Sequence, residues 1–591
     1  MTVTPSSDSA PWDGGRDPYH PQPPAQPPLE PVRQGGGGRL RWLAAILATV
    51  LVLGSLAVVF LLANPPAAAG GISPMARFAP QDSAMYIELR LDLPGDQRDS
   101  VISFMSHFPG FADPATFDQK ISDTLDQILG SSQDEVGWKG DIEPWFGGQV
   151  VVFAGSFEGS QGTPQGGTLV FSVKDPAALE SFLDRAEDHA DYETSEYRGA
   201  TIRTTRVAGQ LTSFAALDDA LLVSYRIEDM HAALDVNAGA AQGLTDEPGF
   251  EASMARLTGD RLAAFYLDGE AIAESIESTM GAMPLAAGPF ASQLEQFPGT
   301  MVGQLRAVTD HLVLEFRATP RAGQSFPNLP QNRNSALVAS FPADALVYGE
   351  IRDLGAGIKL TVTQVLEALG EFGMGGEGVD QMLGQAEQFL GTKPEDFLDF
   401  LGDSGFAFSA DGDEYGGGII AAVTDEATAR QRLDRLVTSL RTLLAFAGPD
   451  VPVTIEEQTH AGATLTVFRL RDEMPGMGDL PVSSLSYTVH DGRLLMGTDD
   501  FVAAALDRTE ADSLGGSAGF RNALEQAGEA NGGFFYFNIG ELRQLVEHHV
   551  PASERTEMAE LWPFFERFSH LISTVSSDGD EIVTRLLLFV E

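Results

Sequence analysis

Two short motifs place a serine where nucleophilic catalysis would need one. GDSG at 402–405 resembles the loop around the nucleophile of serine proteases, and GGSAG at 515–519 fits the G-x-S-x-G turn of many hydrolases. The hydrolase turn requires a strand that leads into the serine, yet no apolar run precedes GGSAG. GDSG has the position of an ordinary turn that enters a strand. Neither serine is therefore predicted to be catalytic.

Patterns typical of cofactor and metal sites are also present. GMGGEG at 373–378 fits a dinucleotide fingerprint, but it follows the helical run LTVTQVLEALGEFG instead of a strand, so we interpret it as a helix end and a loop. Glu547, His548 and His549 are contiguous, and adjacent helical histidines point about 100° apart, which suits a single ion poorly. We therefore expect no catalytic, cofactor-binding or metal-binding residues.

Composition limits the classes of function further. The chain has 591 residues, of which 43% are hydrophobic, enough for more than one packed domain. Its formal net charge of -47 disfavours nucleic-acid binding, because phosphate recognition needs a surface rich in Lys and Arg. The absence of cysteine excludes disulfides and thiolate chemistry.

An apolar segment divides the chain near its N-terminus. WLAAILATVLVLGSLAVVFLLA runs from Trp42 to Ala63, and 22 helical residues span about 33 Å, enough to cross a hydrocarbon core of about 30 Å. Three arginines lie just before it, whereas the next basic residue is Arg77. The positive-inside rule therefore predicts a single-pass plasma-membrane anchor with a cytoplasmic N-terminus and an ectodomain outside. The alternative, a cleaved signal peptide, is disfavoured by the length of the leader and of the apolar run.

The region after this segment contains an internal duplication. Three pairs of segments match in the same order: APQDSAMYIEL (79–89) with FPADALVYGEI (341–351), WFGGQVVVFAG (145–155) with FLGDSGFAFSA (400–410), and GGTLVFSVKDPAALESFLDR (166–185) with GGGIIAAVTDEATARQRLDR (416–435). Loop insertions explain the small drift in their spacing. Collinear matches of this kind indicate a repeat.

Each copy mixes strands and helices. Runs such as QVVVFAG and TLVFSV are typical of strands, and the short turns between them favour antiparallel pairing. We therefore expect an α+β protein with a single N-terminal transmembrane helix followed by two repeated, mainly antiparallel α+β lobes, each with its own core. The expected parts are a disordered Pro/Gly-rich cytoplasmic tail (1–41), the transmembrane helix (42–63), a linker (64–78), the first α+β repeat (79–318), a linker (319–340) and the second α+β repeat (341–591).

The two halves resemble a known bacterial family. The opening Pro-x-Asp-x-x-x-Tyr strand, the DIEPWFGG turn at 141–148 and the single N-terminal anchor are similar to the family catalogued as domain of unknown function thirty-three fifty-two, over about residues 75 to 591. The resemblance implies a membrane-anchored extracytoplasmic protein. It brings no catalytic residues with it.

A Pro-interrupted apolar segment follows the shared Phe-Tyr strand in each copy. Met283 and Phe290 lie in the first segment, and Trp562 and Phe565 lie in the second. Flexible methionine and large aromatic side chains can line an adaptable apolar groove. We hypothesise that this surface captures a hydrophobic ligand or an envelope protein partner. The alternative is that both segments are amphipathic helices that close their own cores.

The sequence thus favours a membrane-anchored, non-enzymatic binding or envelope-interaction module. Two alternatives stay open: an extracytoplasmic hydrolase whose site is assembled from residues distant in sequence, and a structural spacer or sensor. A pocket with clustered Asp, His and Ser would favour the hydrolase, whereas a groove of apolar side chains would favour binding.

Overall fold

The computed structural model describes most of the chain after residue 70. Within this part, no helix is long and apolar enough to cross a membrane. The expected anchor at 42–63 and the tail before it lie outside the described residues. The described stretches are 71–130, 137–155, 166–187, 192–207, 210–280, 297–326, 329–371, 377–411, 414–447, 453–470, 483–550 and 562–591.

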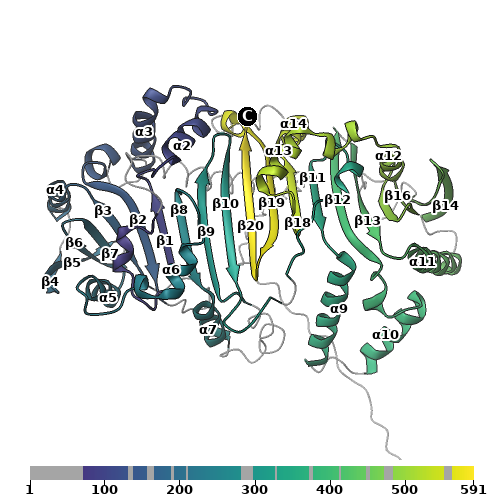
Figure 1. The fold of residues 1–591 in the computed structure, drawn as a ribbon, viewed down its shortest axis with the longest axis horizontal. Helices are drawn as coiled ribbons and strands as arrows, with labels where there is room; N and C mark the ends of the chain where they lie inside the picture. The colour runs from purple at the N-terminus through teal and green to yellow at the C-terminus, as the bar shows by residue number, and fades with distance from the viewer. Residues whose placement is uncertain are drawn as a thin grey trace, which may run out of the picture. The chain divides into compact units, whose positions relative to one another are not determined.

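A single antiparallel sheet of 20 strands runs through both copies in the described residues (Figure 1). This confirms the mixed α+β class and the antiparallel pairing. In the first copy the spatial order is β4 (Glu193–Tyr197), β5 (Ala200–Val207), β6 (Gln210–Ala216), β7 (Ala220–Ser224), β3 (Thr168–Val173), β2 (Phe146–Ala154), β1 (Met85–Arg90), β8 (Ala263–Asp268), β9 (Thr300–Ala307) and β10 (His311–Thr319).

The second copy repeats this order strand for strand. Its strands are β14 (Val453–His460), β15 (Ala463–Leu470), β16 (Ser484–His490), β17 (Arg493–Thr498), β13 (Glu414–Val423), β12 (Leu401–Asp411), β11 (Val347–Ile351), β18 (Gly533–Asn538), β19 (Phe568–Asp578) and β20 (Glu581–Val590). The matched segments of the sequence therefore occupy matched places in the sheet.

The last strands of the two copies, β10 and β20, pair with each other. When the strands are aligned on the turn residues Asp310 and Asp580, Glu315 and Arg585 hold equivalent positions. These two residues lie directly opposite each other in the antiparallel ladder. A local two-fold axis therefore passes between them, perpendicular to the sheet.

Ion pairs reinforce this seam. The nearly buried Glu315 carboxylate accepts hydrogen bonds from Arg585 Nε at 2.8 Å and from Arg317 Nε at 3.1 Å. Arg317 also donates to Asp578 at 3.0 Å and to Glu581 at 3.2 Å. Burial alone would raise the pKa of Glu315, but the hydrogen bonds and charges of Arg585 and Arg317 outweigh it and hold that pKa below its usual range.

Helices cover one face of the sheet along both copies. On this covered face, α5 (Ile227–Asn237) and α6 (Pro248–Met254) pack on the first copy, and α12 (Phe501–Asp507) and α13 (Ala518–Ala527) pack on the second. Every second strand residue, such as Tyr86 or Tyr348, is buried beneath them. This alternation has the period of two that a strand requires.

The opposite face is covered unevenly. In the first copy it carries α2 (Gln97–Ser106), α3 (Phe117–Gly130) and α4 (Pro176–Glu187), which enclose a large apolar cluster. The corresponding segments of the second copy are α9 (Leu354–Glu371), α10 (Glu377–Leu390) and α11 (Glu426–Ala447), and only a small cluster lies beneath α11. The other described helices of four or more residues include α7 (Gly269–Met280), α14 (Ile539–His549) and α16 (Trp562–Phe565).

The cores of the copies are not separate, contrary to our expectation. The cluster beneath α2 includes Ile539, Phe568 and Val590 of the second copy. The reason is the seam: once β10 pairs with β20, a helix seated near the end of β9 also reaches β19 and β20.

The seam should depend on the Glu315–Arg585 pair. We expect Arg585→Gln to lower the free energy of unfolding by about 1–3 kcal/mol, because a buried carboxylate loses a charged hydrogen-bond donor. The stability that Glu315 contributes is present above its unfolded pKa and is lost as the pH falls through its lower folded pKa, so Arg585→Gln should shift that loss to higher pH. Urea denaturation between pH 3 and pH 7 measures both effects.

The control is Arg469→Gln, which removes an exposed pair with Glu456. Exposed pairs contribute less than about 1 kcal/mol, so this variant should behave almost like the unmodified protein. Equal small effects from both substitutions would show that the seam does not rely on its central ion pair.

Candidate functional site

The apolar residues singled out from the sequence are only partly within the described chain. Met283 and Phe290 lie outside it. Trp562 and Phe565 belong to the short helix α16, where their rings lie 5.4 Å apart and Phe565 packs against the cluster beneath α2. The neighbouring Phe564 stacks on Phe108 at 6.1 Å. Helix α16 thus contributes to the shared core, and ligand binding at these residues stays a prediction.

The serines of the hydrolase-like motifs have structural partners. Ser404 lies buried in β12, and its hydroxyl donates to the Gly402 carbonyl at 3.1 Å. Ser517 caps the N-terminus of α13 by accepting from the Phe520 amide.

The histidines at the end of α14 do not form a metal site with other described residues. His549 contacts the Tyr415 hydroxyl at 2.9 Å. Among the described residues, no three His, Asp or Glu side chains are grouped to hold a metal ion.

A buried cluster of ionisable residues lies on the covered face of the first copy. The Glu88 carboxylate, 0% exposed, accepts hydrogen bonds from the Tyr86 hydroxyl and the Ser73 amide, both at 2.8 Å, and from Arg261 Nε at 3.2 Å. Burial, followed by the Glu88 charge, raises the pKa of Tyr86, so its hydroxyl stays protonated and donates. The nearby Arg90 pairs with Asp92.

In the second copy, the equivalent carboxylate of Glu350 pairs with a different arginine. Tyr348 donates to Glu350 at 2.7 Å, as Tyr86 does to Glu88. However, Glu350 pairs with Arg352, which directly follows β11, and Asn531 stands where the first copy has Arg261. Both clusters are buried and therefore offer no surface to a substrate. Their hydrogen bonds and ion pairs instead hold neighbouring segments against the central strand of each copy.

Apolar side chains line an uncovered part of the opposite sheet face. Phe535, Phe406 and Ile419 form one row across β18, β12 and β13, with Gly349 of β11 in register between the two phenylalanines. A Cβ atom on Gly349 would approach the Phe406 ring to 2.3 Å. The glycine therefore lets the ring lie across the sheet.

A second row runs beside the first. It joins Phe316 on β10, Val575 on β19 and Ile351 on β11, with Thr584 and Gly533 in register between them. We call the exposed apolar residues of these strands the open face: Phe316, Ile351, Phe406, Phe408, Ile419, Phe535 and Val575. An antiparallel sheet normally presents polar residues on a solvated face, and contiguous apolar patches usually mark binding surfaces.

Most of the open face belongs to the second copy, and only Phe316 comes from the first. Leu89 and Leu305 of the first copy flank Ala263 in register, and both pack against the cluster beneath α2. Their equivalents, Ile351 and Val575, flank Gly533 in the same way but are 49% and 36% exposed. The same sheet position is therefore closed in one copy and bare in the other.

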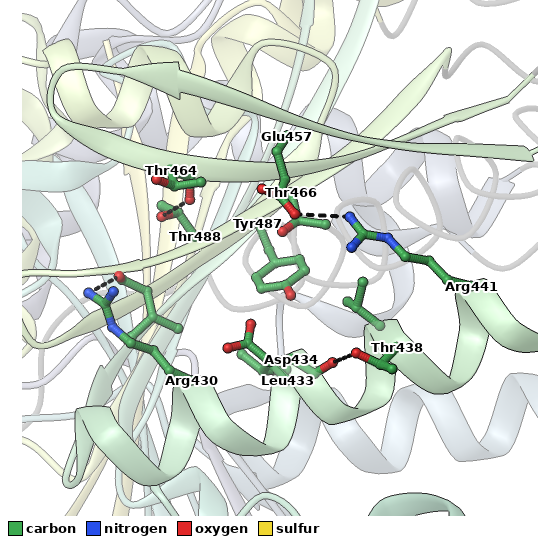
Figure 2. Close-up of a pocket in the computed structure, with 12 residues that line it drawn as sticks. Arg430, Leu433, Asp434, Thr438, Arg441, Glu457, Thr464, Thr466, Tyr487 and Thr488 are labelled. Atoms are coloured by element: carbon green, nitrogen blue, oxygen red, sulfur yellow. Dashed lines mark hydrogen bonds and ion pairs between the residues drawn. The ribbon is translucent and has the colours of Figure 1, made fainter.

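A separate polar pocket of about 360 Å³ lies between α11 and the strands β15 and β16 (Figure 2). Tyr487 projects from β16 toward the helix, and burial raises the pKa of its hydroxyl. Arg430 donates to the Val489 carbonyl at 2.7 Å, and Arg441 donates to Glu457 at 3.0 Å. Both arginines thus tie the helix to the strands.

Comparison with known proteins places this architecture in a family. The model of the family described as "Protein of unknown function (DUF3352)" matches residues 43–590. The chain belongs to this family. This membership confirms the resemblance seen in the strand and turn motifs. Among curated proteins, none matches the chain.

Solved structures of TP0453 show a limited similarity. Crystal form I is 11% identical with a TM-score of 0.23, and it covers 43% of this chain and 81% of that chain. Crystal form III is 14% identical with a TM-score of 0.22, and it covers 44% of this chain and 84% of that chain.

The buried cluster of the first copy should depend on Arg261. We expect Arg261→Leu to lower the free energy of unfolding by about 3–5 kcal/mol, because it leaves the Glu88 charge buried without its cation. Arg226→Leu is the control, since Arg226 is half exposed and lies 3.8 Å from Glu228 at the surface. Thermal and urea unfolding measure the difference. Similar midpoints for the two variants would contradict the role assigned to Arg261.

Proposed function

We propose that this protein is a non-enzymatic binding module that takes up the acyl chain of a lipid on its open face. The observation that supports this function is the contiguous exposure of apolar side chains on strands whose other face is fully packed. Their rows lack charged side chains, which suits a hydrocarbon chain better than a polar ligand. Each methylene group removed from water contributes about 0.8 kcal/mol.

The apolar run lies close in sequence to the binding module, which supports a membrane lipid as the source of the acyl chain. We propose that the run from Trp42 to Ala63 anchors the protein in the plasma membrane with the repeats outside. The first described residue, Gly71, follows Ala63 by 8 residues, which can span at most about 28 Å. A tether of that length keeps the binding module within reach of membrane lipids.

Lipid binding should require the aromatic row of the open face. We expect the double variant Phe406→Gln/Phe535→Gln to bind a lipid with a fluorescent acyl chain, presented in phosphatidylcholine vesicles, about tenfold more weakly than the unmodified ectodomain. Its melting temperature should hardly change, because both rings are already exposed in the folded state. Fluorescence transfer from the vesicles and thermal unfolding measure the two quantities.

The matched control is Phe446→Gln on α11. Phe446 is 87% exposed but lies outside the open face. This variant should bind the lipid like the unmodified protein. The comparison distinguishes binding at the open face from non-specific adsorption to any exposed aromatic side chain. Undiminished binding by the double variant, or no binding by the unmodified ectodomain, would refute the proposed function.

The proposed topology has its own test. Protease added to intact cells should digest the repeats and leave a small membrane-bound fragment that contains the N-terminal tail, because the three arginines before Trp42 hold that end inside. An epitope tag at each end of the chain identifies the fragment. Protection of residues 71–591 until the cells are lysed would show that the orientation is wrong.

A further inference from the structure

Helix α2 shows how the first copy closes the sheet position that is bare in the second. The Ala307 amide donates to Gln97 Oε1 at 2.8 Å, and Gln97 Nε2 donates to the Ala307 carbonyl at 3.3 Å, so the start of α2 is fastened to the end of β9. Its far end places Phe108 at 5.3 Å from Phe568 of the other copy. The helix thus lies across the strands and buries the leucines beneath it.

The equivalent helices of the second copy expose their own apolar side chains. Val365 of α9 is 53% exposed and Met382 of α10 is 71% exposed, and Leu360 and Phe389 are exposed as well. Lys359, near the start of α9, pairs with Asp396 at 2.8 Å and not with the end of a strand. Two apolar surfaces, one on the helices and one on the sheet, are therefore exposed among the described residues of the second copy.

The joint between β11 and α9 contains a residue in the left-handed region and two glycines. Asp353, at this joint, has a φ of 48°, in the left-handed region. The first turn of α9 contains Gly355 and Gly357, and glycine weakens a helix by about 1 kcal/mol relative to alanine. A Cβ atom on Gly355 would approach the Leu398 carbonyl to 2.5 Å, so this glycine allows close packing, whereas a Cβ atom on Gly357 would meet nothing within 4 Å.

We propose that α9 and α10 form a lid that docks on the open face around Ile351 and Val575 when no lipid is bound, and that an acyl chain displaces it. The inference rests on the proposed function, because the lid would compete with the lipid for the open face. In the docked state α9 takes the place on its own copy that α2 takes on the first. The apolar stripe of Ile358, Val362 and Val365, at helical spacing, supplies the contacting side of the helix.

A segment of the same chain is favoured over a second copy of the protein as the occupant. The lid is joined directly to β11, so its effective concentration at the open face far exceeds that of a separate molecule. The formal net charge of -47 also opposes close approach of a second copy. The first copy provides the precedent, because its own helices occupy the equivalent surface.

Disulfide trapping tests the lid in the whole ectodomain, whose sequence has no cysteine of its own. Val365→Cys and Val575→Cys together should form a disulfide under mild oxidation without lipid, detected as a gel shift that reduction reverses. Thr363→Cys with Val575→Cys is the matched control, because Thr363 lies on the opposite side of α9 and should cross-link at least tenfold more slowly. Phosphatidylcholine vesicles should slow the first reaction and leave the second unchanged.

The oxidised Val365/Val575 variant should lose binding of the fluorescent lipid, and reduction should restore it. Circular dichroism before and after oxidation shows that the variant stays folded. If no selective disulfide forms while the reduced protein binds lipid, the lid is wrong and the proposed function stands. If the disulfide forms but no protein binds lipid, the lid stands and the proposed function fails. Full lipid binding by the oxidised protein would show that the lid and the acyl chain do not compete for the open face.

Discussion

The antiparallel pairing of β10 with β20 is the constraint on which the rest of the structure depends. It merges two copies of one fold into one sheet, and it places the two-fold axis between Glu315 and Arg585. In a symmetric pair of identical chains, the residue beside such an axis would face its own copy, and two equal charges would repel. Because the copies are fused, the two positions have diverged into a carboxylate and a guanidinium. Duplication within one chain therefore converts a repulsive position into an attractive one.

The buried carboxylates show the same divergence in the interior. Glu88 and Glu350 occupy equivalent places and accept from equivalent tyrosines, yet their cations come from different segments: Arg261 precedes β8, and Arg352 follows β11. A buried charge needs a partner, but the partner can come from any neighbouring segment that places it within hydrogen-bond distance. Each copy thus neutralises its buried carboxylate with an arginine of its own. Exchange of a single residue between the copies would leave one charge without compensation.

The sequence predicts the strands and the repeat more fully than it predicts the exposed surface. Matches such as APQDSAMYIEL with FPADALVYGEI follow from burial on the covered face, which both copies share. The run Phe534 to Phe537 carries a further signal, because four consecutive aromatic residues make both faces of β18 apolar. That signal cannot say which face stays uncovered, since coverage depends on where α9 and α10 lie. Single-residue patterns also do not reveal that β10 and β20 pair, so the shared core could not be anticipated.

The two outermost strands have a consequence for assembly. Among the described residues the sheet ends at β4 on one side and at β14 on the other, and the two-fold relation makes these ends equivalent. Each offers a line of backbone hydrogen-bonding groups to a neighbouring molecule, which would allow chains to join end to end into ribbons. Both strands, however, carry glutamates on their exposed lengths, Glu193 and Glu196 on β4 and Glu456 and Glu457 on β14. Glu456 and Glu457 already pair with Arg469 and Arg441, so a contact between ends would have to break these ion pairs as well as bring glutamates together, and both effects keep the sheet finite.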